Sequence, residues 1–525
     1  MSLPKLRIVV VPPSMKPPAA SEPCGAGTLR ASAVSGGLWM SGQIAVNKAV
    51  SLGGTLLTMQ MLEPQQFGIA TIAASVLGVV AILPPFTLTD VLLAKPDTLE
   101  RLMGTANRIC VVVTIVTALA LACAGPLAAA LFHQPALTDA CLLLALRPVA
   151  EWMVLVPQTR LRARLRFRSL ASIDGGTQTM ATLLGLGMAW VGYGYASLLL
   201  PQILFTGLRA LLYRWADGRQ QPEGPSWTRT AVRPICVAYL LSGLGQYVHA
   251  GIFMLTPLLI GLYASETDVG FYSTATSLST SIIVVVAVSI GSVLQPVFAQ
   301  LSHDRERQAA AFLRTTKVIA ALAMPICLLQ AALAPAVFRT MLPDKWAGAT
   351  LMTQALCVGQ MFYFPVNSTI GLLKAQGRFG ELFLWQVVQT VLVGLAMLWI
   401  GTRWTASAGM GITLAAACWP LLSSPLGIWL AMRNRNGVSG GIRSVFAAPL
   451  IASLIAVLPA SLATNTLIPA GAAADWVRLA TMPVLVAIIY LIVLREVDRA
   501  LHAELKDLIA LILQMDGLRR TGRAR

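Results

Sequence analysis

Apolar runs of 20 residues or more recur along the whole chain and are separated by short polar connections. About 20 apolar residues in an α-helix are enough to cross the hydrocarbon core of a bilayer, because a helix rises about 1.5 Å per residue. The hydropathy pattern therefore predicts an all-α polytopic membrane protein with about 14 transmembrane helices. The predicted spans are 35–61, 66–94, 107–132, 137–157, 172–192, 194–213, 234–263, 268–298, 313–336, 347–373, 380–401, 406–432, 444–464 and 475–495.

The composition agrees with this pattern. Hydrophobic residues make up 56% of the 525 positions and charged residues 12%, and the mean hydropathy is +0.72. Soluble domains carry about 25% charged residues, so a soluble fold is excluded. The net charge of +17 does not indicate a nucleic-acid partner, since the basic residues lie mainly in the connections between apolar runs.

The basic residues also predict the orientation of the chain. Of the 39 lysines and arginines, 32 fall on one side of the predicted helical array, 4 on the other side and 3 inside spans. Cytoplasmic connections are rich in Lys and Arg, so we expect a multi-pass protein of the bacterial inner membrane with both termini in the cytosol. The opposite connections are short, among them 63–66, 133–135 and 192–194, and cannot form a domain.

Six segments are expected from the pattern. They are a disordered cytosolic tail (1–33), a six-helix bundle (34–213), a cytosolic linker (214–233), a second six-helix bundle (234–432), two additional spans (433–495) and a cytosolic amphipathic helix with a basic tail (496–525). The N-terminal apolar patch ends at paired prolines without a cleavage site, which argues against a signal peptide. The last segment is typical of a helix that lies on the membrane surface, and a partner-binding helix is the alternative.

No motif for catalysis, a metal or a cofactor occurs. Seven of the eight cysteines lie inside apolar runs without metal-ligand spacing, and the four histidines are scattered. P-loop and HExxH patterns are missing, as are the DxD pair or long loop expected of a glycosyltransferase or polymerase. We therefore expect neither a cofactor nor a metal, and no enzymatic activity.

The two halves of the chain share glycine and proline positions in the same order. Four pairs recur: Gly42-Gln43 with Gly245-Gln246, Gly68 with Gly270, Pro126 with Pro335, and Pro157 with Pro365. Each half holds six spans, an even number, so the repeat is parallel and its pseudo-twofold axis runs along the membrane normal. Such a repeat suits a transporter that exposes its site alternately to the two sides.

Three stretches carry a resemblance to a known family. They are LEPQQFGIATIA at 62–73, ETDVGFYSTATSL with SVLQPVFAQLSHDRER at 266–307, and FPVNSTIGLLKAQGRFGEL at 364–382. With them the chain, over about residues 33–460, resembles the polysaccharide transporter family. These are the Wzx-like lipid-linked oligosaccharide flippases of the multidrug/oligosaccharidyl-lipid/polysaccharide (MOP) superfamily.

The resemblance implies two six-helix bundles around a central cavity. It further implies export of an undecaprenyl-diphosphate-linked oligosaccharide from the cytosolic to the periplasmic leaflet for surface polysaccharide biosynthesis. The implied partners are this lipid and the membrane lipids, and the polysaccharide polymerase machinery is a further candidate; no nucleic acid is implied.

A hydrated path for a diphosphate requires cations near the midplane, and Lys48, Arg147 and His249 fall there by position. A charge at this depth costs about 2.5–3.5 kcal/mol on insertion scales, so each should face a cavity or a partner. Glu151, four residues after Arg147, is expected to pair with it. For Lys48 and His249, packing within the helix array with a hydrogen bond to a neighbouring group is the alternative.

Amides are candidates for the lining of a sugar path. Gln43 and Asn47 share one face of the first span, and Gln246 matches Gln43 in the repeat. Small polar side chains also join membrane helices by hydrogen bonds, and this interpretation stays open.

Basic residues at the cytosolic mouth form a candidate entrance that attracts the diphosphate or anionic lipid. In the first half they are Arg160, Arg162, Arg164, Arg166 and Arg168. Lys374 and Arg378 stand at the matching place in the second half. A topology determinant that contacts lipid headgroups is the alternative for both groups.

The main alternative function is a cation-coupled drug or small-solute antiporter of the same superfamily. Such a protein is expected to hold carboxylates inside the membrane, yet Glu151 is the only acidic residue well inside a predicted span. Cations near the midplane instead favour an anionic substrate.

Overall fold

We analysed the protein as a computed structural model, which describes residues 43, 46–81, 85–93, 99–164, 166–218, 229–283, 298, 304–433, 438–467 and 472–506. Over these ranges the chain is helical with short connections, and they contain no strand. The predicted N-terminal tail and half of the predicted 214–233 linker (219–228) lie outside the described residues.

Each predicted span overlaps a described helix, although parts of the spans 35–61, 66–94 and 268–298 lie outside the described residues. The first helix covers 46–61, and the others are α2 (Pro64–Val80), α3 (Pro85–Leu93), α4 (Leu99–Leu131), α5 (Ala136–Leu144), α6 (Arg147–Ala163), α7 (Phe167–Val191), α8 (Ala196–Ala216), α9 (Arg229–Tyr263), α10 (Glu266–Ser281), α12 (Arg305–Met341), η2 (Asp344–Trp346), α13 (Ala349–Ala375), α14 (Phe379–Arg403), η3 (Thr405–Ser407), α15 (Ala408–Met432), α16 (Val438–Leu467) and α17 (Ala472–Val497). Among the described helices, nine are long and apolar enough to cross a membrane.

Two predicted spans consist of two helices each. The second span divides into α2 and α3, and α3 begins at Pro85. The fourth divides into α5 and α6, and Pro148 stands in the first turn of α6. Proline lacks a backbone N–H and fits best in the first turn of a helix, so both prolines favour the start of a new helix. Hydropathy alone does not detect such breaks.

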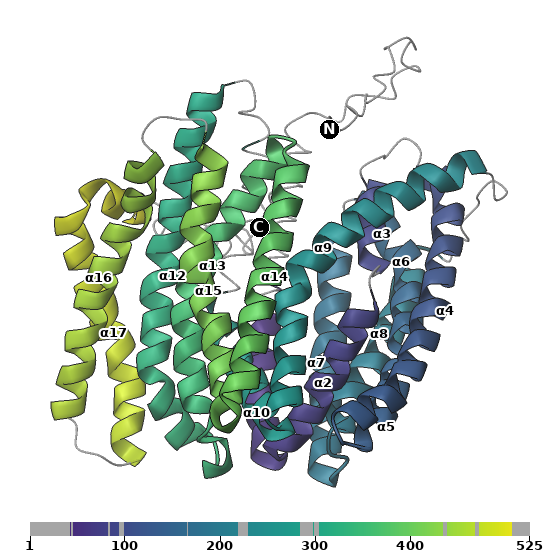
Figure 1. Ribbon diagram of the computed structural model, residues 1–525, viewed down its shortest axis with the longest axis horizontal. Coiled ribbons are helices and arrows are strands. Elements are labelled where there is room, and N and C mark those ends of the chain that lie inside the picture. Colours follow the sequence, from purple (N-terminus) through teal and green to yellow (C-terminus); the bar gives the residue numbers. More distant parts are fainter. Residues whose placement is uncertain are drawn as a thin grey trace, which may run out of the picture.

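The helices form two bundles with two further helices at one edge (Figure 1). In that view α3–α8 stand together on the right, α12–α15 stand on the left, and α16 and α17 lie beyond α12. The oblique helix α9 runs between the two sets, and α2 and α10 cross at the lower end. The bundles meet at this lower end and diverge toward the upper end.

The internal repeat is visible in the geometry of α7 and α14. Both are 25 residues long, and their N-caps, Arg166 and Arg378, have nearly the same backbone angles (φ −78°, ψ 53° and φ −83°, ψ 48°). The Arg166 guanidinium donates to the carbonyl of Ala216 at the end of α8 over 3.2 Å. The Arg378 guanidinium donates to the carbonyl of Leu430 near the end of α15 over 3.0 Å. The two halves therefore repeat a tertiary contact as well as a sequence pattern.

Ion pairs attach the two extra helices and the segment after them to α12. Asp475 of α17 accepts two hydrogen bonds from Arg339, at 2.9 and 3.0 Å. At the other end of α12, Lys317 pairs with Asp498. Burial alone would raise the pKa of the Asp498 carboxyl, but the Lys317 ammonium and the backbone N–H of Leu501 hold this pKa below its ordinary value. The Asp498 carboxylate is therefore ionised at neutral pH.

The segment after α17 packs on the protein at its start. Residues 499–506 are helical, and Leu501 and Leu505 are buried in a cluster that includes Ala321 of α12 and Tyr490 of α17. The remaining apolar positions of the predicted amphipathic helix lie outside the described residues.

Candidate functional site

The closest approach between the two bundles joins the N-terminal turns of α2 and α10. A Cβ on Gly68 would lie 1.8 Å from the carbonyl oxygen of Glu266, and a Cβ on Gly270 would lie 2.0 Å from that of Pro64. Each glycine is the fifth residue of its helix and faces the first residue of the other helix. Only a residue without a Cβ allows this approach. The glycines that the repeat aligns therefore form one reciprocal contact.

An aromatic core fills the space next to these glycines. Trp346 is fully buried, and its indole Nε1 donates to the carbonyl of Met59 over 2.8 Å. The rings of Phe67 and Phe271 contact the indole edge to face, with centroids 5.2 and 6.3 Å away. The residue thus ties helix 46–61, α2 and α10 together.

Polar contacts between the bundles surround this core. The side-chain amide of Gln60 donates to the carbonyl of Met341 over 2.9 Å, and Lys345 Nζ lies 3.1 Å from Glu63 Oε1. We call the set the interbundle seam; it comprises Met59, Gln60, Glu63, Pro64, Phe67 and Gly68 of the first half and Glu266, Gly270, Phe271, Met341, Lys345 and Trp346 of the second. The seam lies at the lower end in Figure 1, where the basic residues are sparse.

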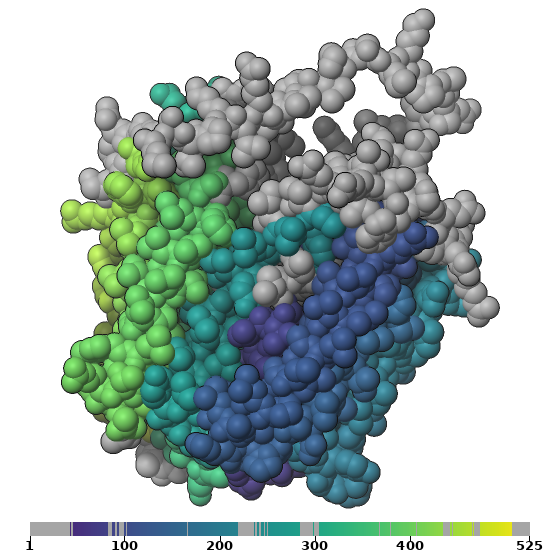
Figure 2. Space-filling view, turned by 45° about the vertical axis from the view of Figure 1, so that its right-hand side comes forward, coloured from purple at the N-terminus to yellow at the C-terminus, as the bar shows by residue number. Residues whose placement is uncertain are grey.

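Above the seam the surface is hollowed. Figure 2 shows an opening between α9 and α4, with atoms of the first helices at its floor. Lys48 lies on helix 46–61, about 20 Å along the helix axis from the seam end, given 1.5 Å per residue. Its side chain is half-buried, and it has no ion pair or hydrogen bond with any residue that the structure describes.

The predicted amide pair of the first helix is present, but it faces α7. The amide of Gln43 donates to Asn47 Oδ1 over 3.0 Å, as the spacing predicts. A Cβ on Gly175 of α7 would lie only 1.9 Å from Gln43 Nε2, and one on Gly54 would lie 2.1 Å from a methyl carbon of Thr182. This arrangement favours the helix-joining interpretation for Gln43 and Asn47.

Two further candidates lie on α9. Gln246 and His249 belong to this helix, but their side chains are outside the part of the chain that the structure describes. Their roles in the cavity stay predictions.

Arg147 forms the predicted pair with Glu151. The two groups are 2.9 Å apart, and their side chains are 43% and 31% exposed. Gln158 lies on the same face of α6, and Val154 and Leu155 at the sides of this face are buried. Arg147 has its own counter-ion, whereas Lys48, which the sequence predicts near the midplane, has no carboxylate partner in the described chain.

Most of the entrance arginines hold the bundle together. Arg160 is only 3% exposed and lies 2.9 Å from Glu100 of α4 and 3.2 Å from Asp217 after α8. Arg164 also contacts Asp217, at 3.2 Å. Arg160 therefore joins the ends of three elements, and its guanidinium is not presented at an open mouth. The sequence offered a signal, since Glu100 and Asp217 lie at the same predicted cytosolic ends of spans.

Removal of this buried guanidinium is expected to destabilise the first bundle. Arg160→Ala leaves the buried Asp217 with a weaker partner, and breaking a buried ion pair from one side costs about 3–5 kcal/mol. We expect a clear fall in the thermal unfolding temperature of the detergent-solubilised protein. The matched control is Arg307→Ala, because the Arg307 side chain is 81% exposed and such a surface pair with Asp304 contributes about 0–1 kcal/mol. Equal effects of the two substitutions would contradict the assignment.

In the second half, contacts within the protein likewise hold the Arg378 side chain in place, whereas Lys374 makes no ion pair in the described ranges. Arg378 lies 2.7 Å from Glu381, besides its bonds to the end of α15. Lys374 is exposed and makes no ion pair within the described ranges, and Arg162 is half-buried, also without one. Of the predicted entrance residues, Arg162 and Lys374 remain as candidates that can meet an incoming anion.

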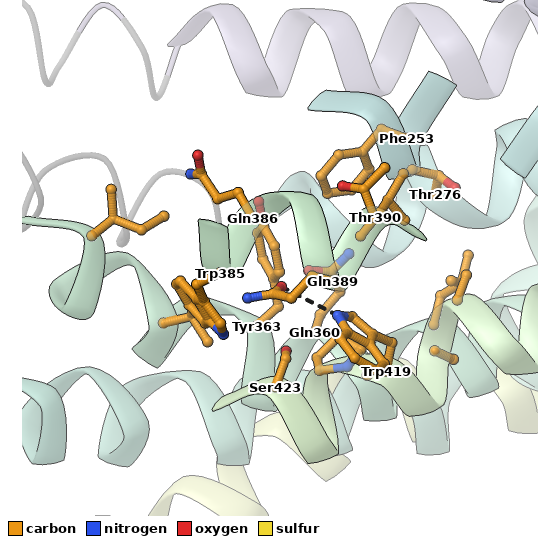
Figure 3. A pocket seen from close by; sticks show the side chains of 18 of the residues that line it. Phe253, Thr276, Gln360, Tyr363, Trp385, Gln386, Gln389, Thr390, Trp419 and Ser423 are labelled. Atoms are coloured by element: carbon orange, nitrogen blue, oxygen red, sulfur yellow. Dashed lines mark hydrogen bonds between the residues drawn. The ribbon is translucent and has the colours of Figure 1, made fainter. Parts of the chain in front are cut away.

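A second site, which the sequence did not predict, lies inside the second bundle (Figure 3). The cavity is lined by α9, α10, α13, α14 and α15 and encloses about 820 Å³ of empty space, including the open space at its mouth. Its polar and aromatic lining includes Gln360, Tyr363, Trp385, Gln386, Gln389 and Trp419.

Close helix packing positions these side chains. Trp385, Gln386 and Gln389 share one face of α14, because residues three and four apart lie together on a helix. Gly427 of α15 leaves room for the Trp385 indole, since a Cβ there would lie 2.7 Å from the ring. The Trp419 indole Nε1 donates to Gln389 Oε1 over 3.2 Å, which orients the amide.

Comparison with known proteins places the chain in a family. Residues 59–351 match the family described as "Polysaccharide biosynthesis protein". The chain is 25% identical over 337 residues to the succinoglycan biosynthesis transport protein ExoT of Rhizobium meliloti (63% of this chain, 67% of that protein). It is 20% identical to the teichuronic acid biosynthesis protein TuaB of Bacillus subtilis (58% and 63%). The chain thus matches about two thirds of the length of these relatives.

Solved structures support the fold. The lipid II flippase MurJ in an inward closed conformation matches with a TM-score of 0.65 at 12% identity, over 91% of this chain and 100% of that one. A MOP superfamily transporter from Pyrococcus furiosus matches with a TM-score of 0.50 at 13% identity, over 77% and 96%. The family match covers more than half of the chain and agrees with the resemblance of its motifs, so the protein belongs to the polysaccharide biosynthesis protein family, and its polytopic helical fold is that of the MOP superfamily structures.

Proposed function

We propose that the protein is a flippase that moves an undecaprenyl-diphosphate-linked oligosaccharide from the cytosolic to the periplasmic leaflet of the inner membrane. The product would serve the biosynthesis of a surface polysaccharide such as exopolysaccharide, capsule or O-antigen. The family membership supports this, as does the structural likeness to a lipid II flippase. The proposed partners are the lipid-linked glycan, membrane lipids and the polysaccharide polymerase machinery.

The interbundle seam is the observation that carries the proposal. The bundles are joined at the end with few basic residues and diverge at the end rich in basic residues. With the basic end in the cytosol, as the charge distribution favours, this is an inward-open transporter closed on its periplasmic side. Parting of the seam would expose the same path to the periplasm, which is alternating access between repeats.

We assign the diphosphate to Lys48. A diphosphate that crosses the bilayer needs a cation inside the membrane, and a desolvated ammonium–phosphate contact is a strong, charge-assisted one. Arg147, His249 and Gln246 remain secondary candidates for the cavity, and Arg162 and Lys374 for its entrance. The glycan would lie in the cavity while the prenyl tail stays in lipid.

Movement of a labelled lipid between leaflets tests this function. The purified protein is placed in liposomes that contain a fluorescent undecaprenyl-diphosphate-linked oligosaccharide, and an impermeant quencher is added outside. The proposal predicts that more lipid reaches the quencher, and faster, than in protein-free liposomes. Retention of the lipid together with exchange of a cationic dye against protons would instead support the antiporter and overturn the flippase.

A further inference from the structure

We propose that the cavity in the second bundle is a binding site for an uncharged sugar ring of the transported glycan. This inference rests on the proposed function and adds to it a second subsite, separate from the cationic path at Lys48. The side chains that would bind the ring are Gln360, Gln386, Gln389, Trp385 and Trp419.

Two buried amides in the cavity lack partners. Gln360 is 7% exposed, and its side-chain oxygen has no hydrogen-bond partner among the described residues. The side-chain nitrogen of Gln389 is likewise buried without a partner there, although its oxygen accepts from Trp419. Leaving a buried amide unpaired is unfavourable, so such groups normally have hydrogen-bond partners in proteins. The unpaired acceptor and the unpaired donor both belong to side chains that line the cavity.

The remaining chemistry of the cavity fits a pyranose. A pyranose has faces of C–H groups and a rim of hydroxyls, each of which can donate and accept. The two indoles offer flat apolar surfaces with a negative π-face that favours C–H groups. In the view of Figure 3 the amides of Gln360 and Gln389 lie between Trp385 and Trp419. The cavity thus offers apolar surfaces for the faces of a ring and amides for its rim.

The part of the lining that the structure describes contains no charged side chain, which indicates an uncharged ligand. The cavity-lining side chains include no Asp, Glu, Lys, Arg or His. The other bundle is different at the equivalent place: Asp174 and Gln386 both stand eight residues after the matching N-caps. Asp174 accepts a hydrogen bond of 2.6 Å from Tyr213 and lies 3.6 Å from Arg209. At this position, therefore, the second bundle has a neutral amide where the first bundle has a paired carboxylate.

The depth of the cavity agrees with a place on the transport path. Gln360, Gln389 and Trp419 each lie near the middle of their helices, α13, α14 and α15. A sugar at this level would be about halfway across the bilayer. Its hydroxyls would be paired there with protein groups, as polar groups within a membrane require.

The test compares sugar binding with lipid movement. The protein is placed in lipid nanodiscs without sugar detergents, and saturation-transfer NMR records binding of methyl glucopyranoside, methyl galactopyranoside and cellobiose. We expect binding of at least one of these, and at least tenfold weaker binding in Gln360→Leu, Gln389→Leu and Trp419→Leu. Gln202→Leu on α8 and Trp399→Leu, both exposed, are the controls and should bind as the intact protein does.

Thermal stability separates a binding role from a structural one. The Gln→Leu substitutions remove an unpaired buried amide, so we expect the unfolding temperature to stay the same or to rise. If these variants unfold at lower temperature and keep their sugar binding, the amides are structural and the proposal is wrong. Absence of sugar binding by the intact protein would also overturn it.

The flippase assay distinguishes the two proposals. If the lipid moves equally fast in the intact protein and in Gln389→Leu, the sugar site is refuted while the flippase stands. If sugars bind and the variants lose this binding, but no lipid moves, the cavity is a sugar site and the flippase assignment fails.

Discussion

Gly270→Leu is expected to hold the interbundle seam open. A Cβ at this position already lies 2.0 Å from the backbone oxygen of Pro64, so α2 and α10 must separate before a leucine fits. Overpacking of this kind destabilises the closed state by about 1–3 kcal/mol. It does not destabilise a state in which the seam has parted. A difference of this size shifts a two-state equilibrium about 5–150-fold.

Cysteine labelling measures this shift. Ala349 is fully buried in the cluster around Trp346, so Ala349→Cys, in a background without the native cysteines, should react slowly with an impermeant maleimide. With Gly270→Leu added, we expect labelling to be at least fivefold faster and lipid movement to be slower. Gly187→Leu is the control, because a Cβ there meets nothing within 4 Å. Unchanged labelling in Gly270→Leu would show that the glycine contact does not hold the bundles together.

Lys48→Ala is expected to slow lipid movement at least tenfold. The substitution removes a half-buried cation that has no counter-ion among the described residues, and with it a charge-assisted contact to the diphosphate. An increase of about 1.4 kcal/mol in the activation free energy of the rate-limiting step already slows lipid movement tenfold. Lys48→Arg keeps the charge and should retain most of the rate.

The paired arginine provides the comparison for Lys48. In Arg147→Ala with Glu151→Ala, both members of a pair that neutralises itself are removed, so the net charge of the path does not change. We expect this double variant to lose less than threefold in rate. An unaffected Lys48→Ala variant would mean that the lysine packs structurally and that another group carries the diphosphate.

The repeat could be predicted from the sequence, but its main consequence could not. Gly68 and Gly270 are aligned by their places at the starts of corresponding spans. That each glycine contacts the helix of the other follows only from packing about the pseudo-twofold axis. Trp346 illustrates the same point, because its partners Met59, Phe67 and Phe271 are distant in the chain.

The candidate site was predicted in part. Depth in a span is readable from hydropathy, which identified Lys48 and the Arg147–Glu151 pair, but the face of a helix is not. The contact of Gln43 with Gly175 of α7, for example, depends on the face of the helix and could not be read from depth.

The sugar cavity was missed although the sequence carries a signal for it. Trp385, Gln386 and Gln389 form a polar and aromatic stripe at helical spacing in an otherwise apolar span. Gln360 and Trp419, on other helices, complete the site only in the folded bundle.

The central claim, that transport requires the seam to part, is tested most directly by locking it. Glu63→Cys and Lys345→Cys replace an interbundle ion pair of 3.1 Å, so a short cleavable bis-thiosulfonate can bridge the two thiols. The account predicts that the bridged protein in liposomes moves no labelled lipid-linked oligosaccharide, and that reductive cleavage of the bridge restores movement. Each single-cysteine variant treated in the same way should stay active. Lipid movement at the full rate with the bridge intact would contradict alternating access through this seam.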